Sequence, residues 1–479
     1  MIALALLAAC TTEVPEQRTP DAVDLLGGSE VLLITPAALE EAWQPWVDWK
    51  NARGLPTAMI TVEELDASEQ GEDLAARIRA GLQRYAAQGT RFVVLGADAP
   101  LIPTREVSLW ADAHLDDGYL VETFASELYY ADLDGDWDSD GDGVYGEPED
   151  AMDLMPDLVV SRLPARSSDQ VSGFVDKVFA YERWPLTDYQ DRALLMGEWA
   201  GTFSGFDFYS SSAQEALILP HLPSDFEVTR LYEQYDQYEG ALDNTRQTQK
   251  DAFNRGQGFV LNFGHGSAST LSNLSLDDLW QLDNTDRPML LATVECFGCA
   301  FDDPSPDHVA CEAFVLAEGG GVAYLGNTTY GIGFPSLTDF YILFVEGLYE
   351  GLEDGPIAST FGEAMVDTQR AFPTAETLAA EGHTDRWTQM ALVMVGDPTV
   401  EPWLGTPTAL SLEEDAEGCW KVRADDQPAE GVSVTLYGPG EVQWRSETGA
   451  DGVACTGTHP QATSVTAWRR GAVPAERTL

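Results

Sequence analysis

The stretch that decides the fold covers residues 262–301, NFGHGSASTLSNLSLDDLWQLDNTDRPMLLATVECFGCAF. One apolar run, residues 258–263, ends at Gly264-His265-Gly266, and a second, residues 289–294, ends just before Cys296. Short apolar runs bounded by turn residues predict strands that are buried on both faces. In an open α/β sheet, ligands bind beyond the carboxyl ends of such strands. The sequence therefore predicts a rim on which an imidazole and a thiol stand together.

A histidine and a cysteine at one rim indicate nucleophilic catalysis, in which the thiolate attacks and the imidazole moves the proton. The glycines beside His265 are expected to let the backbone turn sharply and to leave the ring uncovered. Other interpretations stay open, since a lone histidine is often structural and a lone cysteine is often a small core residue. Cys296 and Cys299 also form a C-x-x-C pattern, which is compatible with a redox pair, half a metal site or a disulfide.

The two motifs, in this order and at this separation, resemble the gingipain-like cysteine peptidases, a family of secreted bacterial proteases. The matching residues are Gly264-His265-Gly266 and 296–301, and the similarity continues through 311–314 (CEAF) and 319–326 (GGGVAYLG). The resemblance implies an α/β fold: a caspase-like, three-layer catalytic domain with two α/β subdomains. Strand-like and helix-like segments alternate from residue 30 to about 105, which independently predicts a parallel sheet.

The resemblance assigns roles to individual residues. Cys296 is the expected nucleophile, and His265 the general base and acid. The backbone N–H groups of Gly266 and Cys296 are expected to bind the oxyanion. Family members place an acidic residue after an earlier strand to orient the histidine, and Glu198 is the candidate, with Asp207 close by. Its carboxylate would accept the second imidazole N–H. No clear counterpart of the residue that reads the P1 side chain is found, so specificity stays open.

An acidic segment after residue 130 carries a metal-binding pattern. Counted from Asp136, residues 136–147 (DWDSDGDGVYGE) meet the twelve-residue EF-hand rule, with carboxylates at alternate positions, glycine at the sixth and glutamate at the twelfth. Hard oxygen ligands spaced in this way wrap a hard cation, so a structural calcium ion is expected; the alternative is a solvated acidic loop. The predicted ligands are Asp136, Asp138, Asp140, Asp142, Val144 (through its backbone or a water) and Glu147. No organic cofactor is expected.

The N-terminus suggests export. Residues 1–10 (MIALALLAAC) resemble a lipoprotein signal peptide whose lipobox ends at Cys10, the expected lipidation site, although a basic leader is missing. Residues 11–28 are polar and would form a linker. We therefore expect an exported protein, anchored to the outer membrane or found at the surface of a bacterium, that meets the membrane only through this lipid.

The composition of the chain excludes some classes of binding partner. The chain of 479 residues has 26 Lys and Arg against 80 Asp and Glu, a formal net charge of −54. Such a field repels nucleic acid and anionic membrane surfaces, so no nucleic-acid partner is expected. Six cysteines are too few for a scaffold built from disulfides.

The expected domains are an N-terminal α/β subdomain with the calcium loop (29–187), a catalytic α/β subdomain (188–405) and a small all-β, immunoglobulin-like sandwich (406–479). Short alternating segments separated by turns predict the sandwich. Cys419 and Cys455 could form a bridge within it, and the pairing of Cys299 and Cys311 is undecided.

The sequence thus predicts a secreted or surface-anchored cysteine endopeptidase that hydrolyses proteins or peptides through a thioester acyl-enzyme. Two alternatives remain: a catalytically inactive surface adhesion or binding protein on a peptidase scaffold, and a sortase-like processing enzyme for exported proteins.

Overall fold

The computed structural model describes residues 28–115, 118–150, 152–203, 206–302, 308–332, 336–352, 356–380, 382–438 and 441–479. The predicted lipobox with Cys10, and the predicted linker up to residue 27, lie outside the described residues. Within the described ranges, no helix combines the length and the apolar character needed to cross a membrane.

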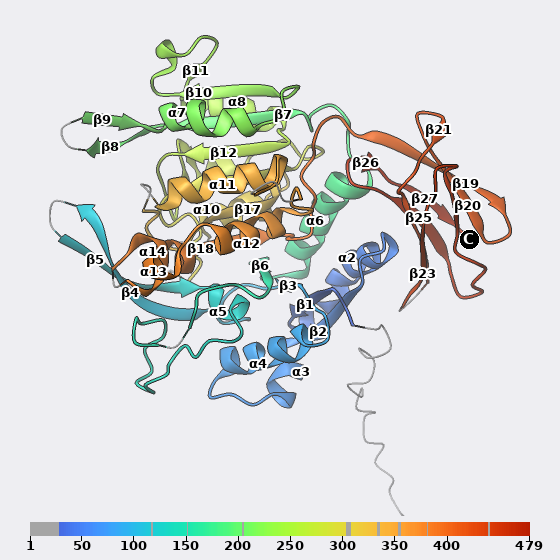
Figure 1. Ribbon diagram of the computed structural model, residues 1–479, viewed down its shortest axis with the longest axis horizontal. Coiled ribbons are helices and arrows are strands. Elements are labelled where there is room, and N and C mark those ends of the chain that lie inside the picture. Colours follow the sequence, from blue (N-terminus) through green and yellow to red (C-terminus); the bar gives the residue numbers. More distant parts are fainter. Residues whose placement is uncertain are drawn as a thin grey trace, which may run out of the picture.

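A single sheet of eleven strands forms the centre of the molecule, in the order β11-β10-β7-β12-β16-β17-β18-β6-β3-β1-β2 (Figure 1). The strands span Val31–Thr35 (β1), Thr57–Thr61 (β2), Phe92–Leu95 (β3), Val159–Arg162 (β6), Arg192–Gly197 (β7), Glu227–Tyr232 (β10), Leu242–Asp243 (β11), Phe259–Phe263 (β12), Met289–Val294 (β16), Gly321–Asn327 (β17) and Leu392–Gly396 (β18). The apolar side chains of the inner strands are almost completely buried, as strands covered on both faces require, whereas β2, β10 and β11 at the two edges are more exposed.

The sheet consists of two parallel halves joined at one seam. Strand β17 pairs with β18 in the antiparallel direction, whereas the other neighbouring pairs are parallel. The half that contains β7, β12 and β16 belongs to the predicted catalytic subdomain. The other half contains β1, β2, β3 and β6 of the N-terminal subdomain, together with β18 from the far end of the catalytic segment. The two subdomains therefore share one continuous sheet.

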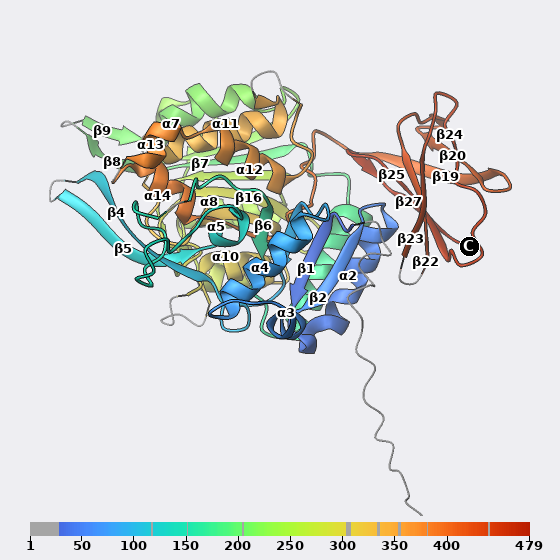
Figure 2. The ribbon, with the colours of Figure 1, turned by 60° about the horizontal axis from the view of Figure 1, so that its bottom comes forward.

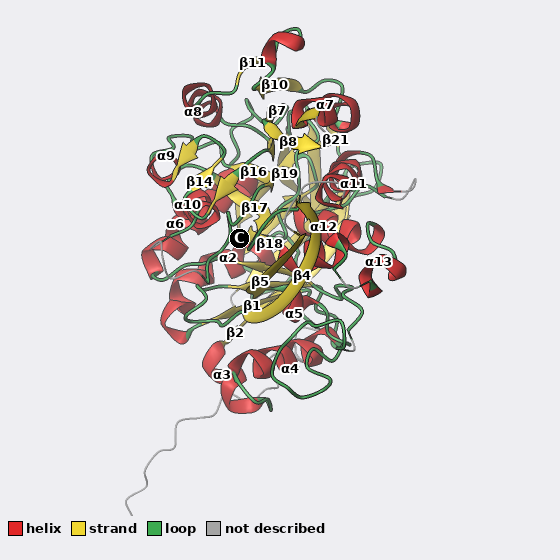
Figure 3. Cartoon of the chain, turned by 90° about the vertical axis from the view of Figure 1, so that its left-hand side faces the viewer, coloured by secondary structure: helices red, strands yellow, loops and turns green. Residues whose placement is uncertain are grey.

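Helices cover both faces of the sheet and give three layers (Figure 3). One layer includes α2 (Glu40–Ala52), α6 (Ser168–Val178), α8 (Arg246–Arg255), α9 (Leu276–Trp280) and α10 (Ala310–Leu316). The other includes α7 (Ser210–Ala213), α11 (Thr338–Tyr349), α12 (Phe361–Ala371) and α13 (Ala375–Ala379). The N-terminal region adds α3 (Val62–Ser68), α4 (Leu74–Ala86) and α5 (Leu128–Ala131), and α14 (Thr384–Ala391) leads into β18. The predicted caspase-like α/β class is confirmed.

Two hairpins extend from the sheet on the side where β7 and β12 end (Figure 1). Strands β4 (Arg105–Leu115) and β5 (Gly118–Ser126) form a long one, and β8 (Trp199–Phe203) and β9 (Phe206–Tyr209) form a short one directly after β7. Neither hairpin is among the sequence predictions. The shorter one matters for function, because it lies at the rim where the strands deliver the histidine and the cysteine.

The C-terminal region is a separate small β-sandwich (Figure 2). One sheet contains β19 (Thr408–Ala416), β20 (Cys419–Ala424), β21 (Gln427–Pro428), β24 (Val453–Cys455) and β26 (Ala472–Val473); the other contains β22 (Ser433–Gly438), β23 (Glu441–Glu447), β25 (Ser464–Trp468) and β27 (Ala475–Thr478). Cys419 and Cys455 form a disulfide between directly paired positions of β20 and β24. The predicted all-β C-terminal module is therefore present.

A buried cluster of charges ties the first helix to the end of the α/β region. The ammonium of Lys50 lies 2.7 Å from Glu182 and 2.8 Å from Asp397. Trp46 and Trp49 donate their indole N–H groups to Asp397 and Glu182, respectively. Because all five side chains are buried, their polar groups rely on protein partners instead of water, including Arg53 beside Glu182 and Thr399 beside Asp397.

Candidate active site

The register of the central sheet brings the predicted histidine and cysteine to one place. Strands β12 and β16 are parallel neighbours, and Phe263 pairs with Val294. His265 and Cys296 each lie two residues beyond that pair, at the carboxyl ends of adjacent strands. The His265 ring is exposed, whereas Cys296 is partly buried. The sheet thus presents an accessible imidazole beside a sheltered thiol, as nucleophilic catalysis requires.

The backbone of Trp199 holds the imidazole of His265. The carbonyl oxygen of Trp199 lies 2.8 Å from His265 Nε2 and can only accept a hydrogen bond. This contact places the proton of the neutral ring on Nε2 and leaves Nδ1 as the basic nitrogen. No hydrogen-bond partner for Nδ1 is found in the ranges that the structure describes. The Trp199 ring also lies beside the imidazole, with 6.3 Å between ring centroids.

Glu198 lies beside the histidine as predicted, but it holds the backbone rather than the ring. Its Oε2 accepts the N–H of His265 at 2.6 Å. Its Oε1 accepts the hydroxyl of Ser272 and, at 3.5 Å, the amide of Asn244. Burial raises the pKa of Glu198, while the bonds from Ser272 and His265 act in the opposite direction. The Trp199 carbonyl, at the start of the hairpin that follows β7, accepts the imidazole N–H that Glu198 was predicted to accept.

The two glycines beside His265 are required for a reason other than the one predicted. Neither has a positive φ, so the turn needs no left-handed residue. Instead, carboxyl groups pack against both Cα atoms. A Cβ at Gly264 would lie 2.6 Å from Glu198 Cδ, and one at Gly266 would lie 2.9 Å from Glu295 Cδ. The turn of residues 264–266, called the histidine turn below, is therefore packed between the buried carboxyl groups of Glu198 and Glu295.

The turn after β16 is strained at Phe297, the residue that follows Cys296. Phe297 has φ 58°, which costs a non-glycine residue on the order of 1 kcal/mol. Its N–H donates to Thr329 O at 2.8 Å, and its ring packs on Tyr330 with 4.5 Å between centroids. Burial raises the pKa of the Cys296 thiol, a hydrogen bond from Gly331 N–H lowers it, and Glu295 raises it. The net effect favours the protonated thiol, so nucleophilic attack would need a base.

The surroundings of Cys299 bear on whether it forms a disulfide. Cys299 and Cys311 are both free and completely buried. Their thiols interact with each other, and burial raises the pKa of each above the ordinary value. The N–H of Cys311 also donates to Gly298 O at 3.0 Å. Cys299 thus belongs to the core with Cys311 and does not block Cys296.

In the acidic loop, the structure brings together part of the predicted set of calcium ligands. The carboxylates of Asp138, Asp140 and Asp142 lie within 4.8 Å of one another, and among the described residues neither Asp136 nor Glu147 joins this group. The pKa of Glu147 is raised, first by burial and then by repulsion from nearby carboxylates such as that of Asp142.

The backbone of the loop favours a register that begins at Asp138, two residues later than the predicted one. The N–H of Gly143 donates to Asp138 Oδ1 at 3.2 Å, and Gly143 has φ 84°. In a twelve-residue count that begins at Asp138, Gly143 falls at the sixth position and Glu149 at the twelfth, which is the spacing expected of a calcium loop. In this register Val144 takes the seventh position, where the backbone carbonyl is the ligand. The donor set of three carboxylates and a turn glycine fits a hard cation.

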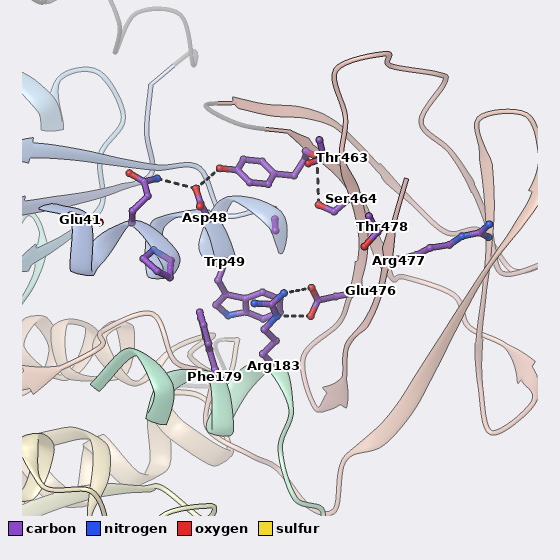
Figure 4. A pocket seen from close by; sticks show the side chains of 14 residues that line it. Glu41, Asp48, Trp49, Phe179, Arg183, Thr463, Ser464, Glu476, Arg477 and Thr478 are labelled. Carbon is purple, nitrogen blue, oxygen red and sulfur yellow. Dashed lines mark hydrogen bonds and ion pairs between the residues drawn. The ribbon is translucent and has the colours of Figure 1, made fainter. Parts of the chain in front are cut away.

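A cavity of about 650 Å³ lies between α2 and the β-sandwich (Figure 4). It lies away from the turns that carry His265 and Cys296, which are called the catalytic turns below. Arg183 forms a bidentate ion pair with Glu476 across it, at 2.7 and 2.6 Å. The hydroxyl of Tyr437 donates to Asp48 on the opposite wall. These contacts attach the sandwich to the α/β region, and none of the residues lining the cavity belongs to the catalytic turns.

The matching family model is that of peptidase family C25, over residues 25–403. This range includes both catalytic turns and the whole eleven-stranded sheet. The chain belongs to peptidase family C25. The resemblance seen in the sequence is thereby confirmed.

Similar proteins are also found among curated proteins and solved structures. Lys-gingipain from Porphyromonas gingivalis is 24% identical over 408 residues, which cover 79% of this chain and 21% of that protein. Gingipain R2 from the same species is 23% identical over 272 residues, or 56% of this chain and 32% of that protein. The chain thus spans between about a fifth and a third of these relatives.

The structure of the Arg specific cysteine proteinase gingipain R has a TM-score of 0.71 and 19% identity, with 94% of this C25 chain and 97% of that chain covered. The complex of the pro- and mature domains of RgpB from Porphyromonas gingivalis has the same TM-score and identity, covering 94% and 99%. At this identity the match shows the fold alone.

Proposed function

We propose that this chain is an exported cysteine endopeptidase, with Cys296 as nucleophile and His265 as general base and acid. The observation that carries the proposal is the pairing of β12 with β16, which places both residues at equal offsets on one edge of the sheet. Membership of peptidase family C25 supports protein or peptide substrates. The orientation of the imidazole, with its Nε2 on a carbonyl, supports Nδ1 as the base.

In the acylation step, Nδ1 of His265 takes the proton of the Cys296 thiol as the sulfur attacks the scissile carbonyl. The base is needed because burial keeps the resting thiol protonated. The imidazolium that forms keeps its Nε2–H bond to Trp199 O and lies near the Glu198 carboxyl, whose charge stabilises it. It then gives the proton to the leaving amine, the C–N bond breaks, and a thioester remains on Cys296.

The developing oxyanion needs donors that face the reacting carbon. Among the described residues, the N–H of Cys296 has no intramolecular acceptor, so it is free to bind the oxyanion. Gly266, on the opposite turn, is the second proposed donor. Water then enters, His265 Nδ1 takes its proton, the hydroxide attacks the thioester, and the sulfur leaves and regains a proton.

Labelling with an acyloxymethyl-ketone probe tests this assignment. The wild type should label at one site, Cys296→Ala should not label, and His265→Ala should label about 100-fold more slowly, since general-base catalysis contributes about 10²–10⁴-fold. Cys299→Ala is the matched control, because it removes a buried thiol three residues away and should still label. A wild type that labels no faster than Cys296→Ala would leave the adhesion alternative in place.

A sortase-like transferase would share the acylation step and differ in the acceptor. Mass spectrometry of peptide products in the presence of excess amine nucleophile separates the two activities. A peptidase releases mainly the free acid, whereas a transferase releases mainly the amine adduct.

Two further parts of the proposal concern export and calcium. Lipidation of Cys10 would attach the protein to the outer membrane, and Cys10→Ser should release it into the soluble fraction. A structural calcium ion in the loop that begins at Asp138 would neutralise carboxylates that otherwise repel one another. It would have no step in the reaction, because the loop lies outside the catalytic turns.

A further inference from the structure

A second acid, Glu295, is built into the centre of the catalytic site. It directly precedes Cys296 and is 1% exposed. Its carboxyl group contacts a glycine of each catalytic turn: a Cβ at Gly266 would lie 2.9 Å from Glu295 Cδ, and one at Gly298 would lie 2.6 Å from it. The side chain therefore fills the space between the histidine turn and the cysteine turn.

The hydrogen bonds of Glu295 differ from those of Glu198. The Oε1 atom accepts the hydroxyl of Tyr324, while Oε2 has no partner among the described residues. Glu198, in contrast, accepts bonds from three donors. An ionised carboxylate that is buried with one donor costs far more free energy than a neutral carboxylic acid in the same place. Burial, and secondarily the charge of Glu198, accordingly act to raise the pKa of Glu295 well above its ordinary value.

The titratable groups around Glu295 come from several elements and offer no compensating cation. They are Glu198 after β7, Cys296 and Cys299 on the same turn, Cys311 on α10, Tyr324 on β17 and Tyr341 on α11. None of the groups in this set is a cation. Burial raises the pKa of Glu295 more strongly than the hydrogen bond from Tyr324 lowers it.

We propose that Glu295 is a positioning residue that acts as a neutral carboxylic acid, wedged between the turns that carry His265 and Cys296. This inference rests on the proposed cysteine-peptidase function. As a spacer, Glu295 sets the separation of the two turns. As a neutral group, it avoids placing a second negative charge beside the thiol.

Ionisation of Glu295 would oppose catalysis in two ways. A charge at Glu295 raises the pKa of Cys296 and so disfavours the thiolate. It would also oppose the negative charge that develops on the oxyanion next to the Cys296 N–H. Activity should therefore be present while Glu295 is protonated and should fall as the pH rises through its pKa in the folded protein.

The kinetic test compares alkylation of Cys296 by iodoacetamide, an uncharged reagent, in the wild type, Glu295→Gln and Glu295→Ala between pH 5 and 10. Gln copies the neutral acid, so Glu295→Gln should react within about threefold of the wild type at pH 6, and its relative rate should rise with pH. Ala removes the spacer and should react about 100-fold more slowly per folded molecule. A Glu295→Gln rate that is low at every pH in folded protein would overturn the proposal.

Glu312→Gln is the matched control, since Glu312 is also 1% exposed and has a raised pKa but bonds to His308 and Val309 on α10. Its rate relative to the wild type should not depend on pH.

Thermal unfolding tests the neutral form independently of activity. The unfolded chain ionises Glu295 above about pH 4.5, whereas the folded chain keeps the proton, so the wild type loses stability as pH rises toward the folded pKa. Glu295→Gln has no such proton, and its Tm advantage should be small at pH 5 and grow by pH 8. A pH-independent difference would refute the neutral Glu295. An unreactive wild-type Cys296 would instead refute the proposed function, and the positioning role with it.

Discussion

Substitution of Gly264 by alanine tests whether buried acids clamp the histidine turn. Because Gly264 does not have a positive φ, alanine is allowed by the backbone and only the contact with Glu198 is tested. The new methyl group would lie 2.6 Å from Glu198 Cδ and 3.0 Å from Cγ. Carbon atoms pack at about 3.5–4.0 Å, so the turn or the carboxyl must move by about 1 Å.

That displacement has calculable consequences. Overpacking of this kind costs about 1–3 kcal/mol of stability. The 2.6 Å bond between His265 N–H and Glu198 would be broken by a 1 Å shift. A misplacement of about 1 Å in a catalytic group lowers the rate by about 100-fold. We therefore expect a moderate fall in Tm and a fall of about 100-fold in the reactivity of Cys296 toward the acyloxymethyl ketone.

The assay measures the second-order labelling rate per folded molecule, together with Tm by calorimetry. Gly173→Ala is the matched control, because Gly173 is exposed on α6 and a Cβ there would meet nothing within 4 Å. That variant should keep the wild-type labelling rate and gain about 0.5–1 kcal/mol from helix propensity. A Gly264→Ala variant that labels within threefold of the wild type would refute the clamp.

Three further predictions concern other parts of the chain. Asp138→Asn should weaken Ca²⁺ binding at least tenfold by calorimetric titration, whereas Asp136→Asn should change it little. A larger loss of affinity in Asp136→Asn than in Asp138→Asn would support the register predicted from sequence. Lys50→Met leaves the buried carboxylate of Asp397 without a cation and should cost about 3–5 kcal/mol in denaturant unfolding, so a loss below 1 kcal/mol would contradict the ion cluster. Replacing Cys419 and Cys455 by serine should cost about 2–4 kcal/mol of sandwich stability and leave labelling of Cys296 unchanged; a loss of labelling would show that the sandwich supports the site.

Much of the site could be predicted because strands buried on both faces are continuous apolar runs. The runs before His265 and Cys296 become β12 and β16, and their parallel pairing follows from the α/β pattern. Glu198 was also found, since it directly follows the apolar strand β7. Local sequence is enough for these residues because each lies at the end of a strand whose direction is fixed by the sheet.

The roles of the supporting groups could not be predicted in the same way. The Trp199 carbonyl that holds the imidazole is a backbone atom, and every residue has one. Glu295 resembles an ordinary residue at a strand end, and only its burial between Gly266 and Gly298 distinguishes it. Both depend on how separate loops meet at the rim, which is a property of tertiary packing.

The sequence by itself determined the core strands that end at His265 and Cys296, the family and the all-β character of the C-terminal module, because hydrophobic period and turn residues act locally. It could not choose the metal-loop register, since both Asp136 and Asp138 are followed by a glycine at the sixth position and a glutamate at the twelfth. In the folded chain, Gly143 donates its N–H to Asp138, which favours the register that begins at Asp138. In the same way, only the tertiary structure explains why glycine is needed on both sides of His265. The two carboxyl groups that pack against these glycines follow other strands, β7 and β16.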